Sequence, residues 1–338
     1  MSRNQRTAVA ILAALGMGVL ILDAQSALAG AREGVQLCIQ TVIPALFPFF
    51  VVSILLTGAL AGQRIPFFRP VGKFCGLPTG GEALLLVGLL GGYPVGAQVV
   101  AQAYRSGRLS RTDARRMLGF CSNAGPAFLF GMLLPMFDNK EAVWVLWLLH
   151  LLSALLTGAL LPGKSQTSVI LHGEKQISLP QALERAVGVM GIVSGWVVFF
   201  RMLIAVFQRW FLWLLPAAGQ TALIGLLELS NGCLELNALP SQGMRFILCS
   251  GFLSIGGLCV TMQTASVTQG LGLGMYLPGK AIQTVFSLLL SYICQMLLFP
   301  AEQQLYLSWS AVVLLAVCVL LILVVLKKSS RNFLKAAV

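Results

Sequence analysis

Ten apolar runs follow one another along the chain, separated by short polar or basic segments. The runs cover residues 7–30, 35–61, 83–104, 114–137, 141–162, 182–207, 219–240, 243–269, 277–299 and 304–326. A helix needs roughly 20 apolar residues to span a bilayer, and most of the runs reach about that length. The pattern predicts an all-α polytopic membrane protein.

Glycine and polar residues interrupt the middle of the runs 83–104 and 219–240. The interruptions are Gly91 to Gly96 in the first run and Glu228 to Gly232 in the second. Each half is too short to cross a bilayer, and broken backbone at membrane depth is tolerated only inside protein or beside a cavity. We therefore interpret both runs as re-entrant helical hairpins.

The runs 114–137 and 243–269 also contain breaks, at Ser122 to Pro126 and at Gly251 to Gly257. Both are long enough to cross as broken helices, which gives about eight crossings and two hairpins. The order helix, hairpin, broken helix, helix then occurs twice, and an odd number of crossings in each unit turns the second upside down. Inverted repeats with broken helices are typical of secondary transporters.

These repeats divide the chain into five regions. They are an N-terminal transmembrane helix at 1–30, repeat 1 at 31–162, a cytoplasmic linker at 163–181, repeat 2 at 182–299, and a C-terminal transmembrane helix with a basic tail at 300–338. The N-terminus has a second interpretation, because Arg3, Arg6 and the small residues at 27–29 also resemble a cleavable secretory signal. Whether residues 1–29 are retained stays open.

Composition agrees with the membrane interpretation, since 57% of the 338 residues are hydrophobic and 10% are charged. A soluble domain carries about 25% charged residues. The net charge of +12 would also fit nucleic-acid binding. With the N-terminus inside, however, 18 of the 23 Lys and Arg residues fall in cytoplasmic segments, Lys280 among them. This positive-inside pattern assigns the basic surplus to membrane orientation, with both termini cytoplasmic and no nucleic-acid partner. We expect the arginines at 105–116, including Arg116, to anchor at lipid headgroups.

The cysteines, histidines and possible nucleophiles do not form the pattern of an enzyme active site or of a metal site. The eight cysteines form no CxxC pair, and the histidines His150 and His172 are isolated. No nucleophile has a partnered base, so we expect no cofactor beyond a coupling ion, Na⁺ or H⁺. His150 either faces the transport pathway or is a packing residue with satisfied hydrogen bonds.

Helix breaks leave backbone N–H and C=O groups unpaired, and these groups can bind a solute or an ion. The candidate ligands beside them are Gly92, Tyr93, Ser122, Asn123, Glu228, Ser230, Asn231, Ser254 and Gln263. The candidate hinge residues are Gly91, Gly96, Gly125, Pro126, Gly232, Gly251, Gly256 and Gly257. The alternative role for these glycines is close helix packing.

Among the charges inside apolar runs, Glu228 and Arg201 are the exceptional ones to test. A carboxylate at mid-membrane depth costs several kcal/mol unless it is paired, protonated or bound to a ligand. Glu228 is a candidate site for a coupling ion or a proton, and its alternative roles are pairing with Arg201 or capping a half-helix. Arg201 is also a candidate for contact with an anionic solute.

The segment GLLGGYPVGAQVVAQAYRSGRLSRTDARRMLGFCSNAGPAFLFG, from Gly88 to Gly131, resembles the YlbJ-like sporulation integral membrane proteins. IPALFPFFVVS at 43–53 and the later segments ELSNG and MQTASV fit the same family, which carries a nucleoside-recognition or Gate domain. The resemblance implies a fold similar to that of concentrative nucleoside transporters. It also suggests a role in sporulation, where a member of the family is associated with moving dipicolinic acid across the mother-cell-derived membrane.

The sequence therefore favours a secondary transporter that works by alternating access in a bacterial cell membrane. The expected solute is a small anionic or aromatic carboxylate, with dipicolinic acid as the first candidate. Leu253 lies where nucleoside transporters carry a polar Asn, which weakens the case for a nucleoside. The alternatives are a nucleoside or Gate-type ion permease and a non-transporting scaffold in spore-envelope assembly. A homo-oligomer remains open, as do the coupling ion and the direction of transport.

Overall fold

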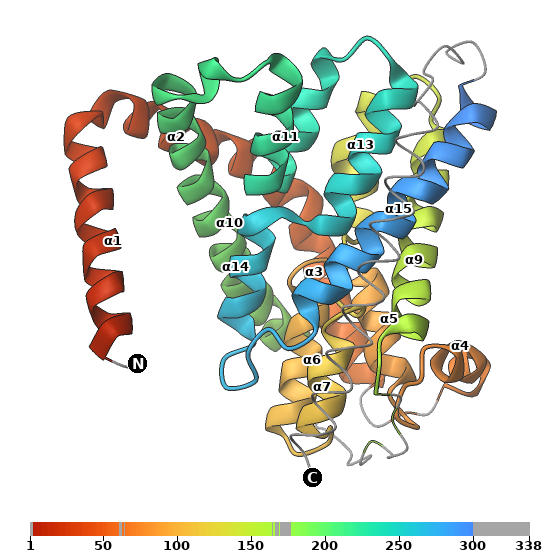
Figure 1. Ribbon diagram of the computed structural model, residues 1–338. Helices are drawn as coiled ribbons and strands as arrows, with labels where there is room; N and C mark the ends of the chain where they lie inside the picture. Colours follow the sequence, from red (N-terminus) through yellow and green to blue (C-terminus); the bar gives the residue numbers. More distant parts are fainter. Residues whose placement is uncertain are drawn as a thin grey trace.

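The computed structural model describes residues 3–60, 63, 65–163, 165, 169 and 177–299, and within these residues every regular element is a helix (Figure 1). The main helices are α1 (Arg3–Leu22), α2 (Ala24–Leu37), α3 (Ile43–Leu60), α4 (Arg69–Phe74), α5 (Glu82–Leu90), α6 (Val95–Arg105), α7 (Arg111–Met117), α9 (Glu141–Leu160), α10 (Leu179–Trp210), α11 (Ala217–Leu227), α12 (Leu229–Glu235), α13 (Gln242–Ile255), α14 (Gly257–Val267) and α15 (Tyr276–Leu298). The short helical segments used below are η1 (Cys38–Val42), α8 (Pro126–Phe128) and η3 (Leu129–Leu133). The all-α prediction is confirmed for the part of the chain that the structure describes.

Within the described ranges, five helices are long and apolar enough to cross a membrane. They are Ala24–Leu60, Glu141–Leu160, Leu179–Trp210, Gln242–Val267 and Tyr276–Leu298. The count of eight crossings and the inverted orientation of the repeats stay predictions. The C-terminal helix expected at 300–338 and most of the linker expected at 163–181 lie outside the described residues.

The first helix ends earlier than the apolar run 7–30 predicts. Asp23 stops α1 and caps α2 by accepting a hydrogen bond from the backbone N–H of Ser26, at 3.3 Å. The same carboxylate accepts a 2.9 Å hydrogen bond from Trp210 Nε1 and lies 3.5 Å from Arg209 Nε. The first helix therefore ends at Leu22, before the capping carboxylate, and not near residue 30 as expected. Helix α1 stands apart from the other helices (Figure 1).

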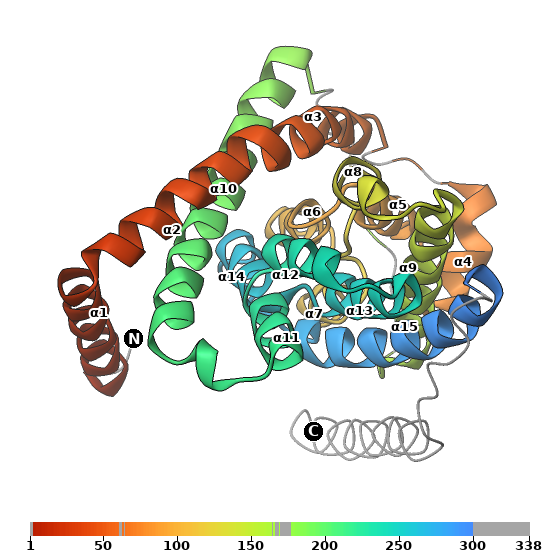
Figure 2. The same ribbon diagram turned by 90° about the horizontal axis from the view of Figure 1, so that it is seen from above.

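The path from α2 through η1 to α3 packs along α10 and forms a frame on one side of the molecule (Figure 2). Glycines permit this close approach. A Cβ at Gly30 would lie 2.6 Å from Ala205 Cβ, and one at Gly34 would lie 2.8 Å from Val198 Cα. Gly30 is therefore a packing residue inside α2, and the remaining inner helices gather on the other side of the frame (Figure 2).

Two pairs of short helices, α5 with α6 and α11 with α12, lie among these inner helices. A glycine pair lets each pair of helices cross closely. A Cβ at Gly96 would lie 3.0 Å from Gly88 Cα, and a Cβ at Gly232 would lie 2.2 Å from Gly225 Cα. Gly96 and Gly232 thus have a packing role that leaves no room for a side chain.

The two expected breaks differ in form. Between α7 and α8 the backbone at 122–125 belongs to no helix, whereas α13 passes directly into α14 at Gly256. Gly256 has φ +72°, a conformation that favours glycine. Gly251 lies inside unbroken α13, where a Cβ would come 3.0 Å from Leu288 of α15. The second break is therefore narrower than the sequence at 251–257 indicates.

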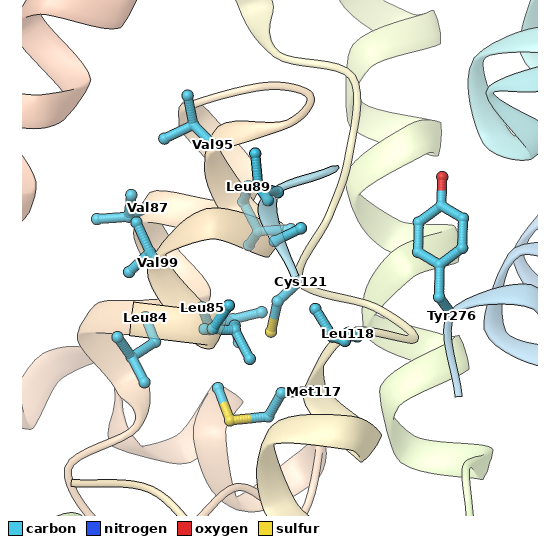
Figure 3. Close-up of a cluster of buried hydrophobic side chains, with 14 of the residues drawn as sticks. Leu84, Leu85, Val87, Leu89, Val95, Val99, Met117, Leu118, Cys121 and Tyr276 are labelled. Atoms are coloured by element: carbon cyan, nitrogen blue, oxygen red, sulfur yellow. The ribbon is translucent and has the colours of Figure 1, made fainter. Parts of the chain in front are cut away.

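Buried apolar side chains fix the base of the first break. Leu85 of α5 and Met117, at the end of α7, are fully buried, as are Leu118 and Cys121 in the turns that follow. These side chains lie close together below the loop that leads to the break (Figure 3). The irregular backbone at 122–125 thus starts from a packed core.

The prediction that Arg116 anchors at lipid headgroups is wrong, because its side chain is 3% exposed. The guanidinium donates hydrogen bonds to the backbone carbonyls of Cys75, Gly76, Gly158, Leu161 and Pro162. Arginine has five N–H donors in a planar fork, which suits several carbonyls at once. Arg116 therefore ties the end of α9 to the segments around it.

Candidate functional site

Each short helix pair has a joint where its two helices meet, at residues 91–94 between α5 and α6 and at Glu228 between α11 and α12. A narrow cavity of about 40 Å³ lies where these two joints meet the frame. Seven of the site residues predicted from the sequence line this cavity: Gly91, Gly92, Tyr93, Gly125, Glu228, Ser230 and Gln263. Val42 and Leu46 of the frame close it on the other side, together with Val193 and Val197 of α10. A cavity of this size holds one small ion or a few water molecules.

Glu228 is the charged group on the cavity wall, and it is 1% exposed. One carboxylate oxygen accepts the backbone N–H of Ser230 at 3.0 Å. The other oxygen accepts the backbone N–H of Asn231 at 2.7 Å and its side-chain amide at 2.6 Å. Glu228 thus caps α12, and it forms no ion pair with the described Lys and Arg residues.

Tyr93 connects the joint of the first helix pair to the second half of the chain. Gly92 has φ +76°, and its backbone lies against Gly125, where a Cβ would come 2.8 Å from Gly92 N. The Tyr93 hydroxyl donates a 3.1 Å hydrogen bond to the carbonyl of Leu253, close to the end of α13. The hydroxyl therefore satisfies a carbonyl near the end of α13, 160 positions away in the sequence.

The prediction that Lys280 lies in a cytoplasmic loop is wrong, because this residue is 2% exposed inside the bundle. Its ammonium donates to the Tyr93 hydroxyl at 2.8 Å and to the backbone carbonyl of Ser122. The reason lies in the preceding residue, since a Cβ at Gly279 would lie 2.1 Å from the carbonyl oxygen of Gly119. This contact places the start of α15 directly against the first break.

Ser122 and Asn123 lie behind the cavity wall. The Asn123 amide donates to the Phe120 carbonyl at 2.7 Å, and its side-chain oxygen accepts from Gln283 Nε2 at 2.9 Å. Ser122 Oγ is buried without a hydrogen-bond partner among the described residues. Asn123 therefore holds the shape of the first break, and its polar atoms are already used by the protein.

His150 joins the two breaks. Its Nε2 accepts the backbone N–H of Ala124 at 3.1 Å, and its Nδ1 lies 3.4 Å from Ser254 Oγ in α13. Because Ala124 must donate, Nε2 is unprotonated, and the neutral ring carries its hydrogen on Nδ1. His150 matches the packing role that the sequence left open, and Ser254 is its partner.

Arg201 lies away from the cavity. Its guanidinium forms a 2.5 Å ion pair with Glu33 of α2, and the two side chains are 19% and 53% exposed. The structure therefore does not bring Arg201 together with the other predicted site residues. Gln263 does line the cavity, and its amide also contacts Cys259 Sγ at 3.3 Å.

Sequence reasoning missed Lys280 and Gln283. A signal for Lys280 existed, because it is a lone ionisable residue near the start of an apolar run. Counting basic residues by loop assigned it to membrane orientation instead. Gln283 carried no signal of its own, since a glutamine three residues after a lysine has many roles. Its partner Asn123 is 160 positions away in the sequence.

Comparison with known proteins gives one partial similarity. A stretch of 132 residues, 38% of this chain, is 29% identical to the sporulation integral membrane protein YlbJ of Bacillus subtilis (strain 168). The matched stretch spans about a third of that relative, 32% of its length. No family model and no solved structure matches the chain. The similarity and the apolar helices together support an integral membrane protein related to YlbJ.

Proposed function

We propose that the chain is a secondary transporter that moves a small carboxylate solute by alternating access, with a proton carried by Glu228. Dipicolinic acid is the first solute to test. The similarity to a sporulation membrane protein supports this choice of context. The Gly88–Gly131 segment, whose family resemblance suggested the solute, contains Tyr93 and the first break.

One observation carries the proposal, which is a buried carboxylate on the wall of a cavity between two interrupted helix systems. Burying a carboxylate without a cationic partner costs several kcal/mol, and the three N–H groups at the α12 cap offset part of that cost. A carboxylate that also faces a cavity supports exchange with a proton or a solute. Entry of a dicarboxylate solute would add two negative charges beside Glu228. Transfer of one proton to the Glu228 carboxylate cancels one of the two added charges, so solute and proton would move together.

The dimensions of the cavity support a closed state. An aromatic dicarboxylate does not fit in about 40 Å³, whereas a neighbouring cleft has about 530 Å³. That cleft is lined by residues of η1, η3 and the end of α12, including Thr41, Met132 and Leu234. η1 and α12 continue to the cavity at Val42 and Leu229, and Phe128, the last residue of α8, lines the cavity directly before η3 begins. A solute in the cleft would therefore reach Glu228 once these elements separate.

A Gate-type cation permease is the second candidate, because a small cavity with a carboxylate wall also suits a single cation. The two functions differ in what crosses the membrane. The transporter moves a carboxylate solute together with a proton, whereas the permease conducts a cation and moves no carboxylate. A nucleoside remains a third kind of solute to include, since Gln263 and Glu228 offer hydrogen-bond acceptors to hydroxyl groups.

Proteoliposomes with the purified full chain test the proposal. We expect saturable uptake of labelled dipicolinate that is driven by an inside-alkaline pH gradient. Glu228→Gln should lower the rate of this uptake by roughly tenfold or more. Asn123→Ala should also reduce uptake by deforming the first break. Glu33→Gln is the matched control, because Glu33 is an exposed carboxylate outside the cavity. Uptake of uridine alone would change the solute. Cation current without uptake would favour the permease, and no flux of any kind would favour the scaffold.

A further inference from the structure

The Lys280 ammonium is surrounded by oxygen atoms of the protein. Its Nζ lies 2.8 Å from the Tyr93 hydroxyl and 2.8 Å from Gln283 Oε1, and it also donates to the Ser122 carbonyl. The Ser122 carbonyl is available because the backbone at 122–125 belongs to no helix. The three oxygens come from three separate elements, the first helix-pair joint, the first break and α15.

The hydrogen-bond network fixes all three oxygens as acceptors. The Tyr93 hydroxyl uses its own hydrogen on the Leu253 carbonyl. The amide of Gln283 donates to Asn123 Oδ1, so its oxygen faces Lys280. A carbonyl can only accept. Three acceptors match the three N–H bonds of an ammonium, whereas a neutral amine offers two.

No carboxylate of the described residues forms an ion pair with Lys280. The rings of Tyr93 and Tyr276 instead lie with their centroids 4.9 Å and 5.8 Å from Nζ, within the range of cation–π attraction. Because every N–H is already donated, the ammonium has no donor left for the carboxylate of a solute. The surroundings are those of a bound monovalent cation, and they do not form an anion site.

We propose that the side chain of Lys280 is a tethered cation that fills a monovalent-cation site at the first helix break. The oxygens of Tyr93, Ser122 and Gln283 are the ligands of this site. A cation supplied from solution is then unnecessary at this position. One further step rests on the proposed function. If the chain transports a solute, its uptake needs no Na⁺ at this site, because the Lys280 ammonium already fills it.

Removal of the tether tests the site without any transported solute. Lys280→Ala deletes the equivalent of propylamine and leaves the three oxygens in place. We expect its Tm in detergent to fall by about 10 °C, because a buried charge network loses its centre. Propylammonium chloride should restore at least half of this loss, whereas choline chloride at the same ionic strength and neutral propanol should not. Each variant's Tm is compared with that of the wild type in the same solution, which removes the general effect of each cosolvent.

Lys140→Ala is the matched control. The Lys140 ammonium also donates to two backbone carbonyls, of Leu134 at 3.0 Å and of Phe137 at 2.7 Å, but it lies at the surface. Propylammonium should leave the Tm of this variant unchanged. Equal rescue of both variants, or equal rescue of Lys280→Ala by propanol, would overturn the proposal.

Lys280→Met covers the case in which Lys280→Ala cannot be purified with or without the amine. Methionine fills most of the volume but leaves three acceptors without a donor, so the Tm should fall clearly below the wild-type value. A Tm equal to or above wild type would show that the oxygens need no cation and would overturn the proposal. The Tm tests are independent of solute uptake. Where uptake is found, equal rates in NaCl and in choline chloride support the Na⁺ step, and a requirement for Na⁺ refutes it.

Discussion

The first helix break and the junction between α11 and α12 hold charges of opposite sign in opposite kinds of surroundings. At the first break, oxygens of Tyr93, Ser122 and Gln283 surround the ammonium of Lys280. At the second helix pair, backbone and side-chain N–H groups surround the carboxylate of Glu228. Each charge is stabilised by polar groups of the matching kind, so the two charges have no need to contact each other.

The two sites differ in how far along the chain their partners lie. The donors to Glu228 are within three residues of it, and they form when α12 forms. Lys280 contacts Tyr93 across 187 positions and Ser122 across 158. The Glu228 site is thus built locally, whereas the Lys280 site exists only in the assembled bundle. A change at Lys280 should disturb several elements, and a change at Glu228 should disturb one.

The largest effect is expected from the glycines that let each helix pair cross. Gly96→Ala would place a Cβ 2.0 Å from the Cys121 carbonyl oxygen, and Gly232→Ala would place one 2.2 Å from Gly225 Cα. Each should destabilise the protein by about 3 kcal/mol or more, since backbone must shift in both cases. The fraction that elutes as a single species in size-exclusion chromatography measures the loss.

Gly188→Ala is the control for this pair, because a Cβ there has no atom within 4 Å. It should be neutral or stabilise α10 by up to about 1 kcal/mol. If Gly96→Ala and Gly188→Ala gave the same yield and Tm, close packing would not be the role of Gly96.

An intermediate effect is expected from Glu228→Ala, which removes the cap of α12 and should lower the free energy of unfolding by about 2 kcal/mol.

Combining Glu228→Ala with Lys280→Met tests whether the two sites are independent. Because the charges form no ion pair, the losses should add to within about 0.5 kcal/mol in thermal or denaturant unfolding. A coupling energy above about 1 kcal/mol would show that the two charges act as one network and would contradict the comparison.

The smallest effect is expected at the exposed ion pair on the frame. Arg201→Gln and Glu33→Gln should each change stability by less than about 1 kcal/mol, and the double variant should match either single one. Solute uptake should stay at the wild-type level in all three. Loss of uptake in Arg201→Gln alone, with Tm unchanged, would return Arg201 to the candidate site.

Hydropathy was sufficient to predict the helical fold because burial in a bilayer demands long apolar segments. The glycine clusters likewise marked where helices stop, as at Gly92 and Gly256, whose positive φ angles need glycine. The boundary at Asp23 was missed, since a single capping carboxylate outweighs the apolar residues that follow it. Local chemistry of this kind sets helix ends more precisely than average hydropathy does.

The candidate site was only partly predictable. Glu228 was visible as a lone carboxylate in an apolar run, and one of its expected roles, the helix cap, is the one observed. Lys280 and His150 could not be assigned, because their partners come from remote segments and depend on tertiary packing. The Gly119–Gly279 contact that carries Lys280 into the bundle has no signature beyond two ordinary glycines.

The Tyr93 hydroxyl has a kinetic consequence. It is at once the acceptor for Lys280 and the donor to the Leu253 carbonyl at the end of α13. Any movement that withdraws the first helix-pair joint breaks both hydrogen bonds in the same step, so partial opening gains nothing. In the proposed transporter, the hydroxyl would act as a latch that lengthens the lifetime of the closed state and makes opening an all-or-none event shared by both halves of the chain.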